Sequence, residues 1–507
     1  MAATEDTAAP ATGAAQPRKR VLGLLDVTLF MVSAILVVDQ LTTTAAIGVS
    51  SIGWWVLLIV IFFVPSALIT AELATTYPDQ GGIYSWVLRA FGRKMAARTT
   101  YWYWVNVGMW MPSVYLLFTG VMVALFWGSA SVFDQCLVAI GLVWLTVLVT
   151  SRTLDVSKNV TGVSAALKAV IILSIAVGSV VFAVRHGSAN SFAFSDMLPK
   201  FSVAKTFLPV IVYQLMGFEL VSSMSEEMKR PERNVPRAIG VSGGVIAVLY
   251  ILGTLGILLA LPVSQIGLTE GLVETFKAIF SGSSGLVWIL SLGVMATYFG
   301  NMVTWAMGAN KAAAEAAAAG ELPALLGREG KKGTPIWALV ATGAIATVVL
   351  LGAAIFIKSQ DSLYFAIFAA SSAIFLLPYL LMYPAVIRLR HMDPSTSRPF
   401  RIPGGTTVLW LCTLLTTAII FVSLILFMWT PGEPIDWSYT GPLFAIVGVA
   451  VVAGELIVGY CFRHQPPEPA PTGGSSTPTG GPTPSLDKPG LAASVVQPPE
   501  PREGGPR

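Results

Sequence analysis

Cysteine, histidine and charged residues are scarce in this chain, and each scarcity excludes a class of function. The three cysteines, Cys136, Cys412 and Cys461, lie in or beside apolar stretches and lack the spacing of a metal site or a disulfide framework. The three histidines lie in loops or the C-terminal tail, so no histidine proton relay or zinc centre is expected within the apolar stretches. The sequence contains no clustered catalytic set and no nucleotide-binding motif. We therefore expect neither an enzyme nor a bound cofactor.

The low charge also places the chain in a membrane. Only 11% of the 507 residues are charged and 54% are hydrophobic, whereas soluble domains carry about 25% charge. Apolar runs of roughly 18 residues or more recur, each long enough to cross about 30 Å of hydrocarbon. They predict an all-α polytopic membrane protein with twelve transmembrane helices. These cover about 22–49, 53–75, 100–128, 134–151, 157–183, 206–228, 238–261, 284–310, 335–357, 363–388, 405–430 and 440–462.

The basic residues predict the orientation of the spans, because cytoplasmic loops carry the excess of lysine and arginine. With the N-terminus inside, only five of the 31 lysines and arginines fall in external loops, and one lies within a span. The five are Arg185, Lys200, Lys205, Lys277 and Lys358. We therefore expect a multi-pass protein of the cell membrane with both termini cytoplasmic. The net charge of +4 reflects this topology, and no nucleic-acid partner is inferred.

The two ends of the chain have the composition of disordered cytoplasmic tails. Residues 1–20 end in the basic triplet RKR and lack the apolar core of a signal peptide, so no cleavage is expected. Twelve of the 32 prolines fall within residues 464–507, which are also rich in glycine and threonine.

Ionisable residues deep within a span are costly and usually functional. Lys168 lies near the middle of span 157–183, roughly 16 Å from either interface, which is farther than a lysine side chain reaches. We interpret it as a functional cation, with a structural lysine bound to helix carbonyls as the alternative. Asp39 begins the polar run DQLTTT in span 22–49. This run indicates either an interruption of the helix or a polar packed face.

A second candidate interruption lies in span 206–228, at Gly217 and Glu219. Glycine lets the backbone leave helical geometry, and irregular backbone at membrane depth is tolerated only where it lines a cavity. We expect unwinding near Val38–Leu41 and Gln214–Gly217, at corresponding positions of two five-span halves. Paired interruptions of this kind are typical of secondary transporters built as inverted repeats. Taken alone, Gly217 is equally compatible with close helix packing.

Several motifs resemble the amino acid–polyamine–organocation permeases. GFELVSSMSEEMKRPERNVPRAI (217–239) resembles span 6 of that family, and AELATTYPDQGGIYSWVLRAFG (71–92) resembles the end of span 2. NKAAAEAAAAGELPALLGREGKKGTP (310–335) is similar to the segment after span 8, and LLPYLLMYPAVIRLR with RPFRIPGG to span 10 and its exit. The resemblance covers residues 22–462. It implies a LeuT-like fold with discontinuous helices 1 and 6. The implied parts are a first repeat over 21–203, a second over 204–390, and helices 11 and 12 over 391–463.

The resemblance also implies roles for particular residues. Span 1 reads LVVDQLT, without the Gly-Ser-Gly element of most members, and in this it looks like the glutamate/γ-aminobutyrate antiporter branch. Lys168, Glu219 and Trp110 are the implied coupling or gating residues, with Lys168 in place of a sodium ion between helices 1 and 5. The implied substrate-binding residues are Val37, Val38, Asp39, Gln40, Thr42, Tyr213, Gln214, Gly217, Asn301 and Trp305.

The predicted function is secondary transport of amino acids by alternating access, as proton-coupled symport or as exchange. The expected partners are a small-molecule substrate, the lipid bilayer and protons, with the protein as a monomer or homodimer. A polyamine or monoamine permease of the same fold is the alternative, because a carboxylate at Asp39 favours an ammonium group. A membrane enzyme and a sensor that has lost transport are the hypotheses from other classes.

Overall fold

The computed structural model describes residues 22–78, 81–152, 156–224, 228–330 and 334–464. Every regular element in these ranges is a helix, and Leu22 and Met228 form an isolated bridge. The two predicted disordered tails, 1–20 and 464–507, lie outside the described residues except for His464.

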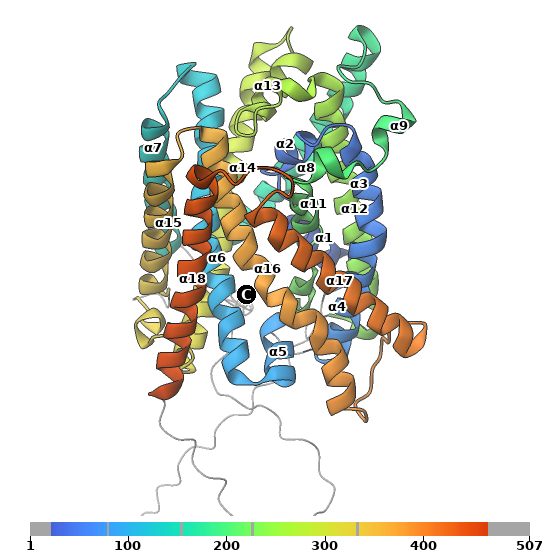
Figure 1. Cartoon of the computed structure of the whole chain (residues 1–507), viewed down its shortest axis with the longest axis vertical. Helices are drawn as coiled ribbons and strands as arrows, with labels where there is room; N and C mark the ends of the chain where they lie inside the picture. Colours follow the sequence, from blue (N-terminus) through green and yellow to red (C-terminus); the bar gives the residue numbers. More distant parts are fainter. Residues whose placement is uncertain (1–21, 79–80, 153–155, 225–227, 331–333, 465–507) are drawn as a thin grey trace, which may run out of the picture.

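Within the described residues, ten helical segments are long and apolar enough to cross a membrane, and each matches a predicted span (Figure 1). They are α3 (Ser50–Leu58) with α4 (Val64–Thr76), α6 (Arg93–Met122), α7 (Val132–Arg152), α8 (Val156–His186), α12 (Pro231–Ala260), α14 (Ser284–Ala318), α15 (Ile336–Phe356), α16 (Gln360–Met392), α17 (Gly405–Met428) and α18 (Trp437–Arg463). The chain is therefore a multi-pass α-helical membrane protein.

The two other predicted spans are each divided. In the first, α1 (Leu24–Ile35) ends and α2 (Leu41–Ala45) begins after the non-helical residues 36–40. In the second, α11 (Leu208–Gln214) is followed after Gly217 by the 3₁₀ helix η3 (Phe218–Met224). Gly217 has φ +99°, a left-handed conformation that glycine adopts without strain. Both predicted interruptions are present, although Leu41 already belongs to α2 and Gln214 still belongs to α11.

The long helices differ in how much of their surface the bundle covers. In the most apolar stretch of α16, 83% of residues are buried, against 72% in α6 and 22% in α18. α6, α14 and α16 therefore form the interior, whereas α18 presents apolar side chains such as Val449 and Leu456 to the surroundings. α1 packs against α8 and α12. The divided helices are thus enclosed by spans on several sides.

Short helices lie at both ends of the bundle (Figure 1). α5 (Ile83–Phe91) is at the end predicted to face the cytoplasm, and α13 (Gly271–Ile279) is at the opposite end. The remaining short elements are η1 (Ile59–Phe63) between α3 and α4, η2 (Val123–Trp127) after α6, α9 (Phe194–Met197), α10 (Phe201–Ala204), η4 (Val263–Gln265) and η5 (Ala324–Gly327).

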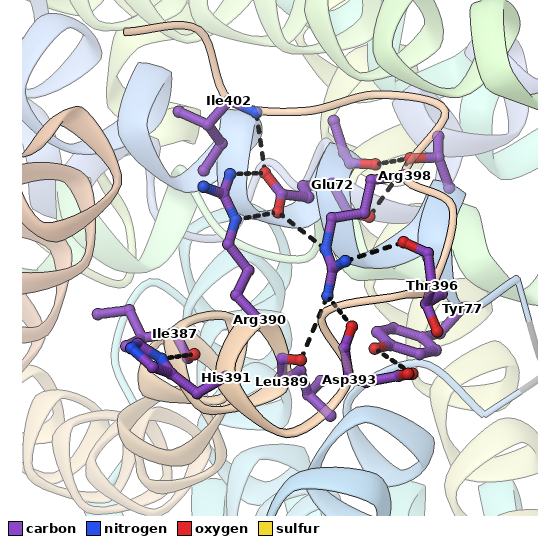
Figure 2. Close-up of polar contacts among 12 residues, drawn as sticks. Glu72, Tyr77, Ile387, Leu389, Arg390, His391, Asp393, Thr396, Arg398 and Ile402 are labelled. Atoms are coloured by element: carbon purple, nitrogen blue, oxygen red, sulfur yellow. Dashed lines mark hydrogen bonds and ion pairs between the residues drawn. The ribbon is translucent and has the colours of Figure 1, made fainter. Parts of the chain in front are cut away.

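A buried carboxylate joins α4 to the end of α16 at the predicted cytoplasmic end (Figure 2). Glu72 accepts hydrogen bonds from Arg390 at 2.6 and 2.5 Å, and from the backbone N–H of Ile402 at 2.8 Å. A nitrogen of Arg398 lies 3.9 Å from the same carboxylate. Arg398 also donates to three backbone carbonyls, those of Leu389, Asp393 and Thr396. The motifs 71–92, 376–390 and 398–405 therefore meet in one ion-pair cluster.

A second buried carboxylate joins α5 to the segment after α14. Glu321 is fully buried and accepts from the Tyr84 hydroxyl, which lies 2.8 and 2.9 Å from its two oxygens. Arg93 at the start of α6 donates to Glu321 at 3.4 Å and to the carbonyl of Ala319 at 3.1 Å. The motifs 71–92 and 310–335, far apart in the sequence, are thus direct partners.

We expect Arg390→Gln to lower the free energy of unfolding by about 3–5 kcal/mol. The substitution leaves the Glu72 carboxylate buried without its main charged partner. Thermal unfolding of the purified protein in detergent measures the change. Arg388→Gln is the matched control, since Arg388 lies on the same helix, is exposed and stacks over the Phe91 ring at 5.2 Å. Equal stability of the two variants would contradict a structural role for the Glu72 cluster.

Candidate functional site

A small cavity lies between the two helix interruptions. Its volume is about 30 Å³, far below the roughly 300 Å³ of the smallest ordinary ligand pockets. The wall consists of Ala34, Ile35, Val37, Trp110, Tyr213, Gln214, Met216, Gly217, Tyr250, Trp305 and Phe375. Both divided spans contribute to this wall, and α6, α12, α14 and α16 complete it. In this conformation the cavity is too small for an amino acid or an amine.

The structure separates the predicted site residues into two groups. Six line the cavity: Val37, Trp110, Tyr213, Gln214, Gly217 and Trp305. Seven are not on its wall: Val38, Asp39, Gln40, Thr42, Lys168, Glu219 and Asn301. Thr42 is directed elsewhere, since its hydroxyl donates to the carbonyl of Leu268 at 2.7 Å. The other six are buried around the two interruptions.

Tyr250 of α12 fixes the start of the first interruption. Its hydroxyl accepts from the N–H of Val37 at 3.0 Å and donates to the carbonyl of Ile35 at 3.1 Å. The ring stacks on Trp55 at a centroid distance of 5.4 Å. This one side chain satisfies two backbone groups that the interruption releases. This role of Tyr250 was not predicted from the sequence. The feature of the sequence that could have indicated it is a polar aromatic residue inside the apolar span 238–261.

Asp39 is a buried carboxylate with one unused oxygen. Its Oδ2 accepts from Gln40 at 2.6 Å. Its Oδ1 has no well-formed hydrogen bond among the described residues, although the indole N–H of Trp110 lies beside this carboxylate as a donor. Lys168 is the opposite charge near Asp39. Because a buried carboxylate oxygen without a partner is costly, this oxygen is a candidate ligand for a positively charged group.

The second interruption carries a matching carboxylate. Glu219 is buried, and its Oε1 has no hydrogen-bond partner in the described part of the chain. The hydroxyls of Tyr103 and Tyr379 lie beside it, as do the backbone N–H groups of Gly217 and of Glu219 itself. Each interruption therefore places one acidic side chain next to its own released backbone N–H groups.

Thr44 and Gln214 connect the two interruptions. The Thr44 hydroxyl of α2 lies 3.0 Å from the carbonyl of Gln40 and 3.0 Å from the Oε1 of Gln214 in α11. The Nε2 of Gln214 has no partner among the described residues and is on a residue of the cavity wall. This nitrogen is a hydrogen-bond donor available to a bound molecule.

Lys168 links three helices around the first interruption. Its Nζ donates to the Oδ1 of Asn301 in α14 at 3.1 Å and to the carbonyl of Ser33 in α1 at 3.4 Å. Ser33 belongs to the last turn of α1, immediately before the interruption. The resemblance implied that Lys168 lies between helices 1 and 5, and its contacts have this arrangement. Asn301, predicted as a substrate contact, is a partner of Lys168 and is not on the cavity wall in this conformation.

Aromatic rings enclose the cavity on the remaining sides. Trp305 is perpendicular to Trp110 at a centroid distance of 5.6 Å and lies 6.3 Å from Tyr103. Phe375 lies 5.6 Å from Tyr103 and 5.3 Å from Tyr213. Rings of this kind attract cations through their π faces. The site thus combines two carboxylates, one lysine and several aromatic faces, without a cluster of metal ligands in the described residues.

Comparison with known proteins identifies this polytopic chain as a membrane transporter. It belongs to the amino acid permease family, whose model matches residues 22–452. This confirms the family resemblance and shows that the protein is a transporter and not an enzyme. Its substrate is therefore a small molecule, and lipid surrounds its spans.

Three curated relatives are similar to this chain in sequence. The chain is 32% identical over 459 residues to a probable agmatine/putrescine antiporter of Lactococcus lactis, covering 89% of this chain and 97% of the relative. It is 30% identical over 402 residues to an uncharacterised transporter of Legionella pneumophila, covering 77% and 86%. It is 24% identical over 372 residues to a glutamate/γ-aminobutyrate antiporter of Lactococcus lactis, covering 69% and 72%.

Proposed function

We propose that this protein exchanges cationic aliphatic amines, such as diamines and guanidino amines, across the cell membrane. The observation that carries the proposal is the pair of buried carboxylates at the two interruptions. Asp39 and Glu219 each have an oxygen without a well-formed hydrogen bond in the described chain. Lys168 is the cation near Asp39, whereas the groups beside Glu219 are neutral hydroxyls and backbone N–H groups. A cationic substrate balances this excess of negative charge, and the rings of the wall favour it further. The printed name of the Lactococcus lactis agmatine/putrescine antiporter supports the same substrate class.

Amino acid transport is the second candidate, and it has specific support. The Nε2 of Gln214 is a donor without a partner among the described residues and is available to a substrate carboxylate. The glutamate/γ-aminobutyrate antiporter of Lactococcus lactis is a relative as well. Amines are favoured because the released N–H groups are engaged: Val37 donates to Tyr250, and those of Gly217 and Glu219 face the Glu219 carboxylate. A substrate carboxylate would also meet the charge of Asp39.

The mechanism that we propose is alternating access in a LeuT-like fold of twelve spans. The divided spans count as helices 1 and 6, in repeats over 21–203 and 204–390, followed by helices 11 and 12 over 391–463. Both interruptions come from one chain, so a monomer, or each half of a homodimer, contains a complete site. Both termini are cytoplasmic in this proposal, as the basic residues predict. Exchange requires no coupling ion, and a proton is the candidate ion for any net uptake.

Counterflow in proteoliposomes tests the proposal. Vesicles containing the purified protein are loaded with unlabelled putrescine, and labelled putrescine or agmatine is added outside. We expect rapid uptake that depends on the internal amine and that external amino acids do not inhibit. Uptake of a labelled amino acid, without uptake of either amine, would establish the second candidate instead.

We expect Asp39→Asn to weaken amine binding by about 1–3 kcal/mol, or roughly 5- to 150-fold, because it removes a charged hydrogen-bond partner and keeps the shape of the side chain. The half-saturating amine concentration in counterflow measures this. Asp26→Asn is the control, since Asp26 is an exposed acid in the first turn of α1 that accepts from Gly23 at 2.8 Å. If Asp39→Asn transports every substrate like the unmodified protein, Asp39 has no role in recognition.

A further inference from the structure

A second and larger cavity lies at the predicted external end of the bundle. Its volume is about 290 Å³, which is at the lower limit of ordinary ligand pockets, about 300 Å³. It is formed by the beginnings of α11 and α16, the segment after α17, and the start of α18. The lining residues used below are Asp361, Phe365, Trp429, Glu433, Asp436 and Tyr439. Unlike the central cavity, this one has room for a small organic molecule.

Three carboxylates line this outer cavity, against one nearby cation. Glu433 pairs with Lys205 at 2.9 Å. Asp436 accepts from the N–H and hydroxyl of Ser438 at 2.9 and 2.6 Å. Asp361 accepts from the N–H groups of Leu268 and Thr269 and from the Thr269 hydroxyl, at 2.6–3.0 Å. Two of the three carboxylates thus have neutral partners only, and the cavity keeps an excess of negative charge.

Neighbouring acids increase this excess. Glu270 and Glu274 lie at the start of α13, close to Asp361. Partial burial and then the like charges of Glu274 and Asp361 raise the pKa of Glu270 above its ordinary value, with Lys277 acting in the opposite direction. Such crowding of acids is relieved when a cation binds nearby.

Aromatic groups complete the wall. Phe365 packs perpendicular to Phe207 at a centroid distance of 4.9 Å, and both line the cavity with Trp429. The hydroxyl of Tyr439 is buried and has no hydrogen-bond partner among the described residues. Carboxylates, aromatic faces and an unused hydroxyl are the groups that bind an ammonium or guanidinium ion with an aliphatic chain.

A row of aromatic rings lies between the outer cavity and the central one. Phe365 lies 6.4 Å from Phe368, and Phe368 lies 5.3 Å from Tyr213, which lines the central cavity. The loop that Asp361 holds is also in contact with the first interruption, because the carbonyl of Leu268 accepts from Thr42 of α2. A molecule in the outer cavity is thus separated from the central cavity by aromatic side chains and one loop.

We propose that the outer cavity is a second binding site for aliphatic ammonium or guanidinium ions, which receives the substrate before it reaches the central cavity. This inference rests on the proposed function, because both sites take the same class of molecule. Asp361 holds the loop at Leu268 and Thr269 in place, and this loop contacts Thr42 next to the first interruption. A cation that binds Asp361 would compete with the N–H groups of Leu268 and Thr269 for its oxygens.

Equilibrium binding of labelled putrescine to the purified full chain in detergent tests this inference. We expect two sites per chain. Asp436→Asn and Trp429→Ala should each weaken one of them at least tenfold, while Trp429→Phe, which keeps a ring, should retain it. Asparagine still caps α18, so Asp436→Asn is expected to fold. Asp134→Asn is the matched control: Asp134 is an exposed acid in the first turn of α7, accepts from Ser131 at 2.7 Å and is outside the cavity.

Combination with Gly217→Leu separates this inference from the proposed function. Gly217→Leu should remove the central site and leave one site that Asp436→Asn weakens. A single site that Gly217→Leu removes, and that neither outer variant changes, would overturn the outer site and keep the proposed function. A single site that Asp436→Asn weakens and Gly217→Leu leaves intact would support the outer site and overturn the central one. Displacement of the outer putrescine by equal concentrations of sodium or potassium would overturn its assignment to amines.

Discussion

Gly217→Leu is expected to abolish exchange and to leave folded protein in the membrane. Gly217 has φ +99°, where a residue with a side chain is strained by roughly 1–2 kcal/mol. Its Cβ would lie 3.2 Å from a side-chain carbon of Ile35, on the opposite wall of the central cavity. The three further carbons of leucine would enter the central cavity, whose volume is only about 30 Å³. We expect counterflow to fall to the background of empty vesicles.

Gly244→Leu is the control for this substitution. Gly244 lies in the membrane-spanning helix α12 and is exposed, and a Cβ there meets nothing within 4 Å. This variant should exchange amines at nearly the unmodified rate. Gel filtration of both variants establishes that the protein is folded. Exchange by Gly217→Leu at a rate close to that of Gly244→Leu would mean that Gly217 serves helix packing and that the substrate binds elsewhere.

Lys168→Met is expected to reduce exchange at least tenfold and to remove its dependence on pH. The substitution keeps most of the side-chain volume but loses the hydrogen bonds to Asn301 and to the carbonyl of Ser33. Hydrogen bonds from a charged group contribute about 1.5–3 kcal/mol each, so α8 would lose its main polar connection to α1 and α14. Asp39 would also lose its nearby opposite charge. Lys168→Ala should have the same effect and additionally leave a cavity.

Counterflow across a range of pH, with and without sodium, measures the role of Lys168. The unmodified protein should require no sodium, because the Nζ of Lys168 already places a positive charge between α1 and α14. Lys200→Met is the control, since Lys200 is exposed at the predicted external end and pairs with Asp196 at 3.2 Å. A sodium requirement, or an unmodified pH profile in Lys168→Met, would make Lys168 a structural residue.

The sequence was sufficient for the spans and the interruptions because their signals are local. Apolar runs mark a helix in lipid wherever it packs, and Gly217 marks a backbone that must leave helical geometry. The exact position of the first interruption was less predictable. The threonines 42–44 suggested irregular backbone, but they form α2, where their hydroxyls find acceptors or partners in other elements.

The walls of the site were predictable only in part, because they depend on contacts between distant residues. Tyr250 bonds to Val37 across 213 positions, and nothing beside Tyr250 in the sequence indicates this partner. Glu72 and Arg390, separated by 318 positions, are a similar case. The sequence identified Asp39, Lys168 and Glu219 because a charge at membrane depth is unusual in itself. None of the three lies on the wall of the central cavity, and this depends on how the helices pack.

The Thr44 hydroxyl has one hydrogen and two acceptors at equal distance, the Gln40 carbonyl and the Gln214 side chain. A hydroxyl donates one hydrogen bond at a time, so Thr44 can bond either within its own half-helix or across to α11. If α2 moved away from α11, Thr44 could keep a hydrogen bond by turning to the Gln40 carbonyl, while the Gln214 oxygen would lose this donor. A buried acceptor without a donor is costly, so such a movement would leave Gln214 in need of a new partner.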